Sequence, residues 1–168
     1  MGISVVVMGV SGCGKSTLAE AVAARLDLPY VEGDAFHSEA NRQKMSHGIA
    51  LTDTDRDGWL DTLAAELRAR APGAVLSCSA LKRRYRDRLR AAAPGLRFLF
   101  LEIDRAHAIE RVAARAGSHF FNASLVDNQF ETLEPPLAEP GVLRLDARAP
   151  LARLVDESLR WLTSEETR

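Results

Sequence analysis

The sequence predicts an α/β fold, with a five-stranded parallel sheet in the order 2-3-1-4-5 and helices on both faces. Three observations support this prediction. Five short apolar runs alternate with segments of helical periodicity, which is typical of right-handed βαβ units. The first apolar run leads into a glycine-rich loop and then into a helix. The chain has 168 residues, about the size of one domain, so we expect a single domain over residues 1–168.

Each predicted element has its own signal. The predicted strands are the apolar runs 3–8, 28–32, 74–78, 96–103 and 142–146. The predicted helices are 15–26, 54–71, 82–90, 105–116, 124–133 and 151–162. The second of these helices begins at a pattern like a capping box, Thr54 to Asp57, and Pro72 follows its end. The polar stretch before it, residues 34–60, has no sustained apolar period, so we expect a pocket wall or lid or, alternatively, a solvated loop with a short helix.

The glycine-rich loop has the spacing G-x-x-x-x-G-K-[ST] between a strand and a helix, the context that confirms a P-loop. Its glycines permit turns in which successive N–H groups converge on phosphate oxygens at a helix N-terminus. We expect Lys15 to reach the β- and γ-phosphates and the Ser16 hydroxyl to bind the Mg²⁺ that bridges them. The predicted nucleotide-binding residues are Gly9, Ser11, Gly12, Cys13, Gly14, Lys15, Ser16 and Thr17.

A P-loop alone leaves the reaction open. The chain has no Asn-Lys-x-Asp guanine reader, which argues against a GTPase, and no apolar strand ends in a Walker B aspartate, which argues against a motor or AAA-type ATPase. A small-molecule kinase with the nucleoside-monophosphate-kinase architecture remains. A regulator that binds ATP without turnover would need a damaged catalytic set, whereas Lys15, Ser16 and Asp34 are all present.

Two carboxylates follow the second predicted strand. Glu32 and Asp34 stand two residues apart, on one face of an extended segment, and the end of this strand lies beside the P-loop in a parallel sheet. We assign Asp34 to orienting or deprotonating the attacking hydroxyl, with a turn-capping role as the alternative. Glu32 takes a lesser share in holding Mg²⁺, through water.

Composition and charge narrow the partners. The formal net charge is −1, so no basic field favours nucleic acid. No apolar run approaches about 18 residues, and the N-terminal run enters the P-loop directly, so we expect no membrane span and no signal peptide. The protein should be cytoplasmic. Cys13 and Cys78 form no disulfide framework or zinc set, and both should lie near the nucleotide, as inert thiols or as a pair whose oxidation blocks ATP.

Four stretches carry a more specific pattern than the P-loop alone. They are residues 9–17, Gly33-Asp34-x-x-His37-x-x-x-Asn41-x-x-Lys44 continued by Asp53-x-Asp55-Arg56-x-x-Trp59-Leu60, Cys78-Ser79-Ala80-Leu81-Lys82-x-x-Tyr85-Arg86-Asp87, and His119-Phe120-Phe121 followed by Gln129-Phe130-Glu131. Together they resemble the gluconokinase family over nearly the whole chain. The sequence departs from the usual pattern at Ser38, Ala50 and Gly58, where many members carry proline, and at Glu32, often aspartate.

The resemblance implies phosphorylation of D-gluconate to 6-phosphogluconate with ATP and Mg²⁺, in a nucleoside-monophosphate-kinase-like P-loop fold, and it suggests a homodimer. By this likeness, residues 34–60 and the turn at Lys82 form the sugar-acid site, and residues of about 115–130 form a lid over ATP. A kinase for another small sugar acid or polyol remains the alternative. The predicted substrate-binding residues are Asp34, His37, Asn41, Lys44, Arg56, Lys82, Arg86, His119 and Gln129.

Five basic side chains fit this chemistry independently of the resemblance. Gluconate is an anion, and Arg56, Lys82 and Arg86 supply cations that can grip a carboxylate. Arg111 and Arg115 stand four apart on one helical face before the lid. They can stabilise charge on the transferring phosphoryl group, or they form a solvated helix face.

Overall fold

The computed structural model of the protein describes residues 2–116 and 123–164. Its sheet has the predicted order, β2-β3-β1-β4-β5, and each of the four pairings is parallel. The strands are β1 (Ser4–Met8), β2 (Tyr30–Glu32), β3 (Ala74–Ser77), β4 (Arg97–Glu102) and β5 (Val142–Asp146). The predicted α/β fold is therefore confirmed.

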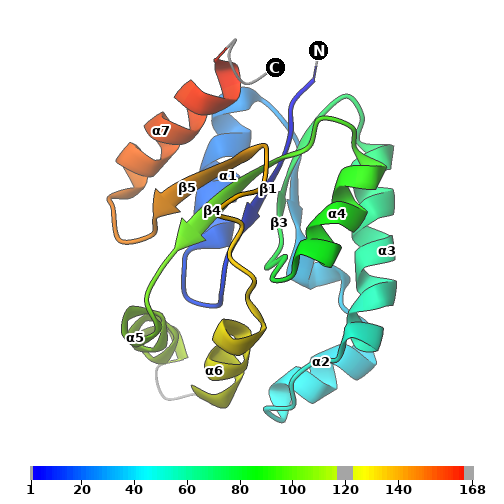
Figure 1. Ribbon diagram of the computed structural model, residues 1–168, viewed down its shortest axis with the longest axis vertical. Coiled ribbons are helices and arrows are strands. Elements are labelled where there is room, and N and C mark those ends of the chain that lie inside the picture. Colours follow the sequence, from blue (N-terminus) through cyan, green and yellow to red (C-terminus); the bar gives the residue numbers. More distant parts are fainter. Residues whose placement is uncertain (1, 117–122, 165–168) are drawn as a thin grey trace.

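The described chain has seven helices and one 3₁₀ turn, η1; α7 follows the last strand, and the other elements connect the strands. They are α1 (Lys15–Leu26), η1 (Gly33–Phe36), α2 (Glu39–Ser46), α3 (Asp53–Ala69), α4 (Arg83–Ala92), α5 (Arg105–Ala116), α6 (Ala123–Thr132) and α7 (Leu151–Thr163). Helices α1 and α7 pack together behind the sheet in Figure 1, and α3 packs on α4, which lies in front of it. Helices α2, α5 and α6 gather at the end toward which the strands point. This is the end where ligands of parallel sheets bind.

The core lies around β1, the central strand. Val5, Val6, Val7 and Met8 are fully buried, as are Phe98 and Leu99 on the neighbouring β4. Because helices cover both faces of the sheet, these strands read as continuous apolar runs rather than as alternating ones. Within the described residues, no helix is long and apolar enough to cross a membrane.

Helix α3 begins one residue earlier than predicted, and its capping box differs. Thr52, not Thr54, is the N-cap, and its hydroxyl accepts from the N–H of Asp55 at 3.1 Å. The Asp55 carboxylate accepts from the Thr52 N–H at 2.9 Å. The sequence offers the spacing twice, from Thr52 to Asp55 and from Thr54 to Asp57, so the pattern did not distinguish them. At the start of α2, Ser38 is also an N-cap, with its hydroxyl accepting from Asn41 N–H at 3.1 Å.

Replacing the cap of α3 tests this start. We expect Thr52→Ala to lower the free energy of unfolding by about 1 kcal/mol, because a helix N–H loses its side-chain acceptor. Chemical denaturation measures the change. Thr62→Ala, on the exposed side of the same helix, is the matched control and should change stability little. An equal loss in both variants would contradict the assignment of Thr52 as the cap.

Acidic and basic side chains join α3 to α4 in a regular series, which we call the charge ladder. Arg84 donates to Asp53 and Asp57, each at 3.1 Å, and Arg88 donates to Asp57 at 3.2 Å and to Asp61. Such partly exposed pairs contribute little each, about 0–1 kcal/mol. The basic run of α4 is therefore paired with α3 along this face, so it is not only a solvated surface.

Candidate active site

The P-loop packs so closely that two of its glycines are required. Gly12 has φ +86°, and a Cβ there would lie 2.7 Å from the carbonyl oxygen of Ala108. At Gly9, with φ +148°, it would lie 2.8 Å from the Leu101 oxygen. Lys15 begins α1, and its Nζ donates to the Val10 carbonyl at 3.2 Å. The loop thus lies across the end of β1 with its lysine folded over it, as a phosphate cradle requires.

Glu32 lies against the P-loop and accepts hydrogen bonds from three hydroxyl groups. Ser16 Oγ donates to it at 2.7 Å, Ser77 Oγ at 2.9 Å, and Tyr30 OH over a shorter distance. Burial acts to raise the pKa of Glu32, but these three hydrogen bonds outweigh it and hold the pKa below its ordinary value. Glu32 is therefore ionised at neutral pH and fixes the hydroxyl of Ser16. Neither Tyr30 nor Ser77 was among the predicted site residues.

Asp34 does not share a face with Glu32, because the extended segment ends between them. The chain turns into η1 at Gly33, where a Cβ would lie 2.2 Å from the Ser77 carbonyl oxygen, so only glycine allows this turn. Asp34 consequently lines a pocket beside the P-loop, and its side chain is 72% exposed. The prediction that both carboxylates lie on one face is wrong.

The pocket joins four segments that lie far apart in the sequence. Its described lining residues are Ser11, Lys15, Asp34, His37, Met45, Ala50, Leu51, Arg56, Trp59, Ser79, Leu125, Asn128 and Gln129. Helix α3 contributes a cation and an aromatic ring one turn apart, Arg56 and Trp59. Ser79, Leu125 and Asn128 were not predicted, because nothing in their local sequence marks these side chains as pocket walls.

His37 and Trp59 form a stacked wall of the pocket. Their ring centroids are 4.2 Å apart, and the Trp59 Nε1–H donates to the Gly33 carbonyl at 2.8 Å. Burial lowers the pKa of His37, the nearby Arg56 lowers it further, and Asp34 opposes them. The imidazole is therefore neutral at neutral pH, 3.9 Å from the Asp34 carboxylate.

Helix α6 reaches the P-loop through Gln129. The backbone N–H of Ser11 donates to Gln129 Oε1 at 2.6 Å, across 118 positions of the sequence. Gln129 therefore lies between the phosphate cradle and the pocket, where a lid residue is expected. His119, the other predicted lid residue, lies outside the described residues.

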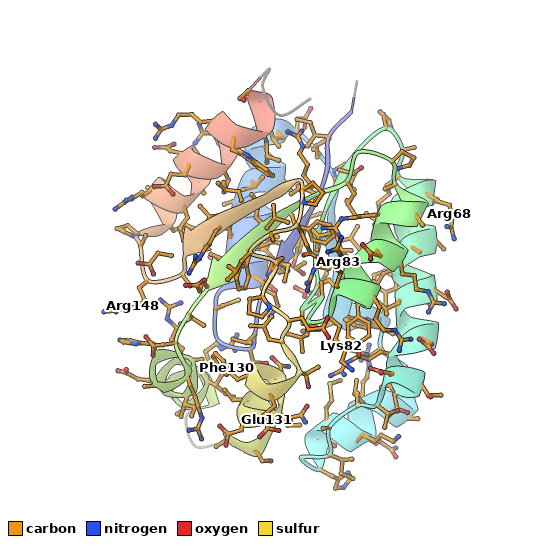
Figure 2. The ribbon with its side chains drawn as sticks, viewed as in Figure 1. Arg68, Lys82, Arg83, Phe130, Glu131 and Arg148 are labelled. Carbon is orange, nitrogen blue, oxygen red and sulfur yellow. The ribbon has the colours of Figure 1, made fainter. Side chains whose placement is uncertain are left out.

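Three predicted substrate-binding residues are paired with the first turn of α3. Lys82 Nζ donates to Asp53 at 3.1 Å, and Lys44 Nζ donates to Asp55 at 2.9 Å. Asn41 Nδ2 donates to the Asp55 carbonyl at 3.0 Å. Figure 2 shows Lys82 at the lower end of α4, near the end of the molecule that carries α6. None of the three belongs to the described lining of the pocket, so their contact with an acceptor stays a prediction.

Arg86 is 1% exposed and holds the backbone behind the pocket. Its guanidinium donates to Glu139 at 2.8 Å, to the Ala80 carbonyl at 2.7 Å and to the Glu134 carbonyl at 2.8 Å. Ala80 has φ 46°, a left-handed conformation that is strained for alanine and persists only where its surroundings fix it. The structure gives Arg86 this role, behind Ser79, in place of the predicted contact with the acceptor.

The two arginines of α5 have different positions. Arg111 donates to the carbonyls of Gly12 at 3.4 Å, Cys13 at 3.5 Å and Ala147 at 2.9 Å, so it braces the outer side of the P-loop. Arg115 is exposed. Neither lies in the described lining of the pocket.

Both cysteines are buried free thiols. Burial raises the pKa of Cys78 to about 12, so this thiol stays protonated and unreactive at neutral pH. We therefore expect a mild disulfide-forming oxidant to leave enzymatic activity unchanged, measured before and after treatment with a reductant as the control. Inactivation that the reductant reverses would instead support the alternative in which oxidation blocks ATP.

Fold and site together define the class of the protein. The P-loop and the end of β2 meet at the carboxyl edge of the sheet, through the contact of Ser16 with Glu32, and an adjoining pocket holds a carboxylate and a cation. This arrangement is that of a P-loop kinase that phosphorylates small molecules.

Comparison with known proteins identifies the family. A family model described as an AAA domain matches residues 5–136. The gluconokinase of Gluconobacter oxydans is 41% identical over 165 residues, which cover 96% of this chain and 92% of that protein. The thermosensitive gluconokinase of Escherichia coli is 39% identical over 160 residues, covering 93% and 85%. A solved gluconokinase from Sinorhizobium meliloti has a TM-score of 0.87 at 49% identity, covering 94% of this chain and 89% of that one.

The chain therefore belongs to the AAA-domain family of P-loop proteins and, within it, to the gluconokinases. The sequence argued against a motor or AAA-type ATPase because no strand ends in a Walker B aspartate, and β3 ends at Ser77 without a carboxylate. The gluconokinase relatives agree with the small-molecule kinase that remained, so the family description names a shared domain and not a motor activity.

Proposed function

We propose that the protein transfers the γ-phosphoryl group of ATP to the 6-hydroxyl of D-gluconate, giving 6-phosphogluconate and ADP. The observation that carries the proposal is one pocket lined by Lys15 of the P-loop, the carboxylate of Asp34 and the guanidinium of Arg56. These groups match, in turn, a phosphoryl donor, an attacking hydroxyl and a carboxylate. The named gluconokinase relatives support the same reaction.

Six residues of the pocket lining have a role in this reaction. Asp34 accepts a hydrogen bond from the attacking hydroxyl and orients it toward the donor, while Lys15 neutralises charge on the phosphates. Arg56 grips the acceptor carboxylate with two parallel hydrogen bonds. The stacked rings of His37 and Trp59 pack against the carbon chain. Gln129 belongs to the predicted lid of about 115–130. Its hydrogen bond from the Ser11 N–H breaks when a nucleotide enters.

The residues fit a Mg²⁺ ion carried in with ATP. Ser16 Oγ donates a hydrogen bond to Glu32 at 2.7 Å, so the lone pairs of the Ser16 oxygen are available to a cation. No group of three or more His, Cys, Asp or Glu side chains among the described residues could hold a metal, so the phosphates would supply most of its ligands. Bound there, Mg²⁺ neutralises charge that develops on the phosphates. Glu32 is the hydrogen-bond partner of Ser16 and, as predicted, would also hold Mg²⁺ through water.

The test is a coupled assay of ADP release with ATP and Mg²⁺. We expect turnover with gluconate to exceed the rate without an acceptor. A rate no higher than that background would contradict the proposal. Comparing kcat/KM for gluconate with related aldonates, D-glucitol, shikimate and nucleoside monophosphates decides whether another sugar acid or polyol is the better acceptor. No turnover with any of them would favour the regulator that binds ATP. A homodimer and a cytoplasmic location remain predictions.

A further inference from the structure

Tyr85 lies on α4, outside the pocket, and the proposed reaction does not use it. The residue is 1% exposed, and its hydroxyl contacts two residues of α3. It donates to the Asp53 carboxylate, and it accepts from Arg56 Nη1 at 3.3 Å. Tyr85 thus stands between a carboxylate outside the pocket and the cation proposed to bind the acceptor.

The direction of these hydrogen bonds is fixed by the chemistry of the three groups. A phenol has one proton to donate, an ionised carboxylate only accepts, and a guanidinium only donates. The Tyr85 proton is therefore committed to Asp53, and a lone pair of the same oxygen faces Arg56. The hydrogen bond to Tyr85 holds one of the five N–H groups of Arg56, and so it fixes the orientation of the planar guanidinium.

Neighbouring cations keep Asp53 in its ionised form. Lys82 lies 3.1 Å and Arg84 3.1 Å from its two carboxylate oxygens. Hydrogen bonds from Tyr85 and then from Lys82 hold the pKa of Asp53 below its ordinary value. Burial, and then the hydrogen bond to Asp53, raise the pKa of Tyr85. At neutral pH the proton accordingly stays on Tyr85 and points to Asp53.

We propose that Tyr85 is a positioning residue for the acceptor, and that with Asp53 it aims the Arg56 guanidinium into the pocket. The inference rests on the proposed function, in which the acceptor is a carboxylate. A bidentate grip needs the guanidinium held in one plane, and an arginine that is held beforehand loses less conformational entropy on binding. Lys82, predicted to bind the substrate, acts in this arrangement through Asp53.

Tyr85→Phe removes one oxygen atom and keeps the ring that packs α4 against α3. We expect KM for gluconate to rise about tenfold, because the loss of a hydrogen bond to a charged group weakens binding by about this factor. KM for ATP and kcat should change less than about twofold. Calorimetry should show gluconate binding weakened by the same factor. Ser158→Ala, which removes a fully buried hydroxyl from α7, is the matched control for loss of a buried hydroxyl.

Three further variants separate positioning from a structural role. In the Arg56→Ala background, Tyr85→Phe should have no additional effect on kcat/KM for gluconate, since Tyr85 acts through Arg56. Asp53→Ala should resemble Tyr85→Phe, whereas Asp53→Asn, which keeps an acceptor for the Tyr85 proton, should recover part of the loss. Equal changes in both KM values, or a tenfold effect that persists without Arg56, would overturn the inference. If the wild type does not phosphorylate gluconate, the proposed function fails instead.

Discussion

Asp34→Asn lowers kcat by about a hundredfold to ten-thousandfold and changes both KM values little, if Asp34 orients or deprotonates the attacking hydroxyl. Asparagine keeps the size of the side chain and an oxygen, but it is a poor base and a weaker acceptor. Because Asp34 lies in η1 with its side chain 72% exposed, the substitution should leave the fold intact. Steady-state kinetics with gluconate and ATP measure the effect.

The matched control is Asp27→Asn. Asp27 is exposed at the C-cap of α1 with φ 54°, a conformation that asparagine also adopts, and it lies in no part of the site. This variant should keep the wild-type kcat. An Asp34→Asn enzyme with full kcat would remove Asp34 from catalysis and leave it as a turn residue.

Arg56→Ala is expected to raise KM for gluconate about a hundredfold or more, with KM for ATP near the wild-type value. Arg56 is 8% exposed and is the predicted acceptor cation that lines the pocket beside Asp34. Truncating one member of a desolvated charge pair costs about 2–5 kcal/mol, which corresponds to a factor of about 30 to 5,000 and so includes a hundredfold change. Titration of each substrate at saturating levels of the other gives the two constants.

Arg68→Ala provides the control for the Arg56 variant. Arg68 belongs to the same helix but is exposed and points away from the body of the protein in Figure 2. It should leave both KM values unchanged. If Arg56→Ala raised the two KM values alike, the residue would support the site as a whole, and the carboxylate would have to bind elsewhere.

Local patterns predicted the parts of the site that depend on neighbours in sequence. The P-loop was found from its spacing between a strand and a helix, and Gly12 and Lys15 lie where that spacing requires. The alternation of apolar runs with helices predicted a parallel sheet, which is confirmed. In these cases the chain within a few residues decides the geometry.

Charge pairs across the fold could not be predicted in this way. Lys44 and Lys82 look like acceptor cations in sequence, yet their partners, Asp55 and Asp53, stand 11 and 29 positions away. Arg86 similarly meets Glu139 across 53 positions. A charged residue that already has a close partner is less available to a substrate, and the presence of such a partner depends on tertiary distances.

The charge ladder between α3 and α4 has a consequence for alignment. Its charges repeat every four residues on both helices, so sliding α4 along α3 by one turn, about 5.4 Å, would place Arg84 beside Asp57 and Asp61 and keep part of the pairing. The charge ladder therefore stabilises the packing of α4 on α3 but does not select one alignment of the two helices. The hydrogen bond from Tyr85 to Asp53 could form again with Asp57, but the one from Arg56 could not, because the residue one turn beyond Arg56 is Leu60, which offers no hydrogen bond. The phenol therefore favours one alignment of this pocket wall, together with the buried side chains of Leu60, Leu63 and Leu89.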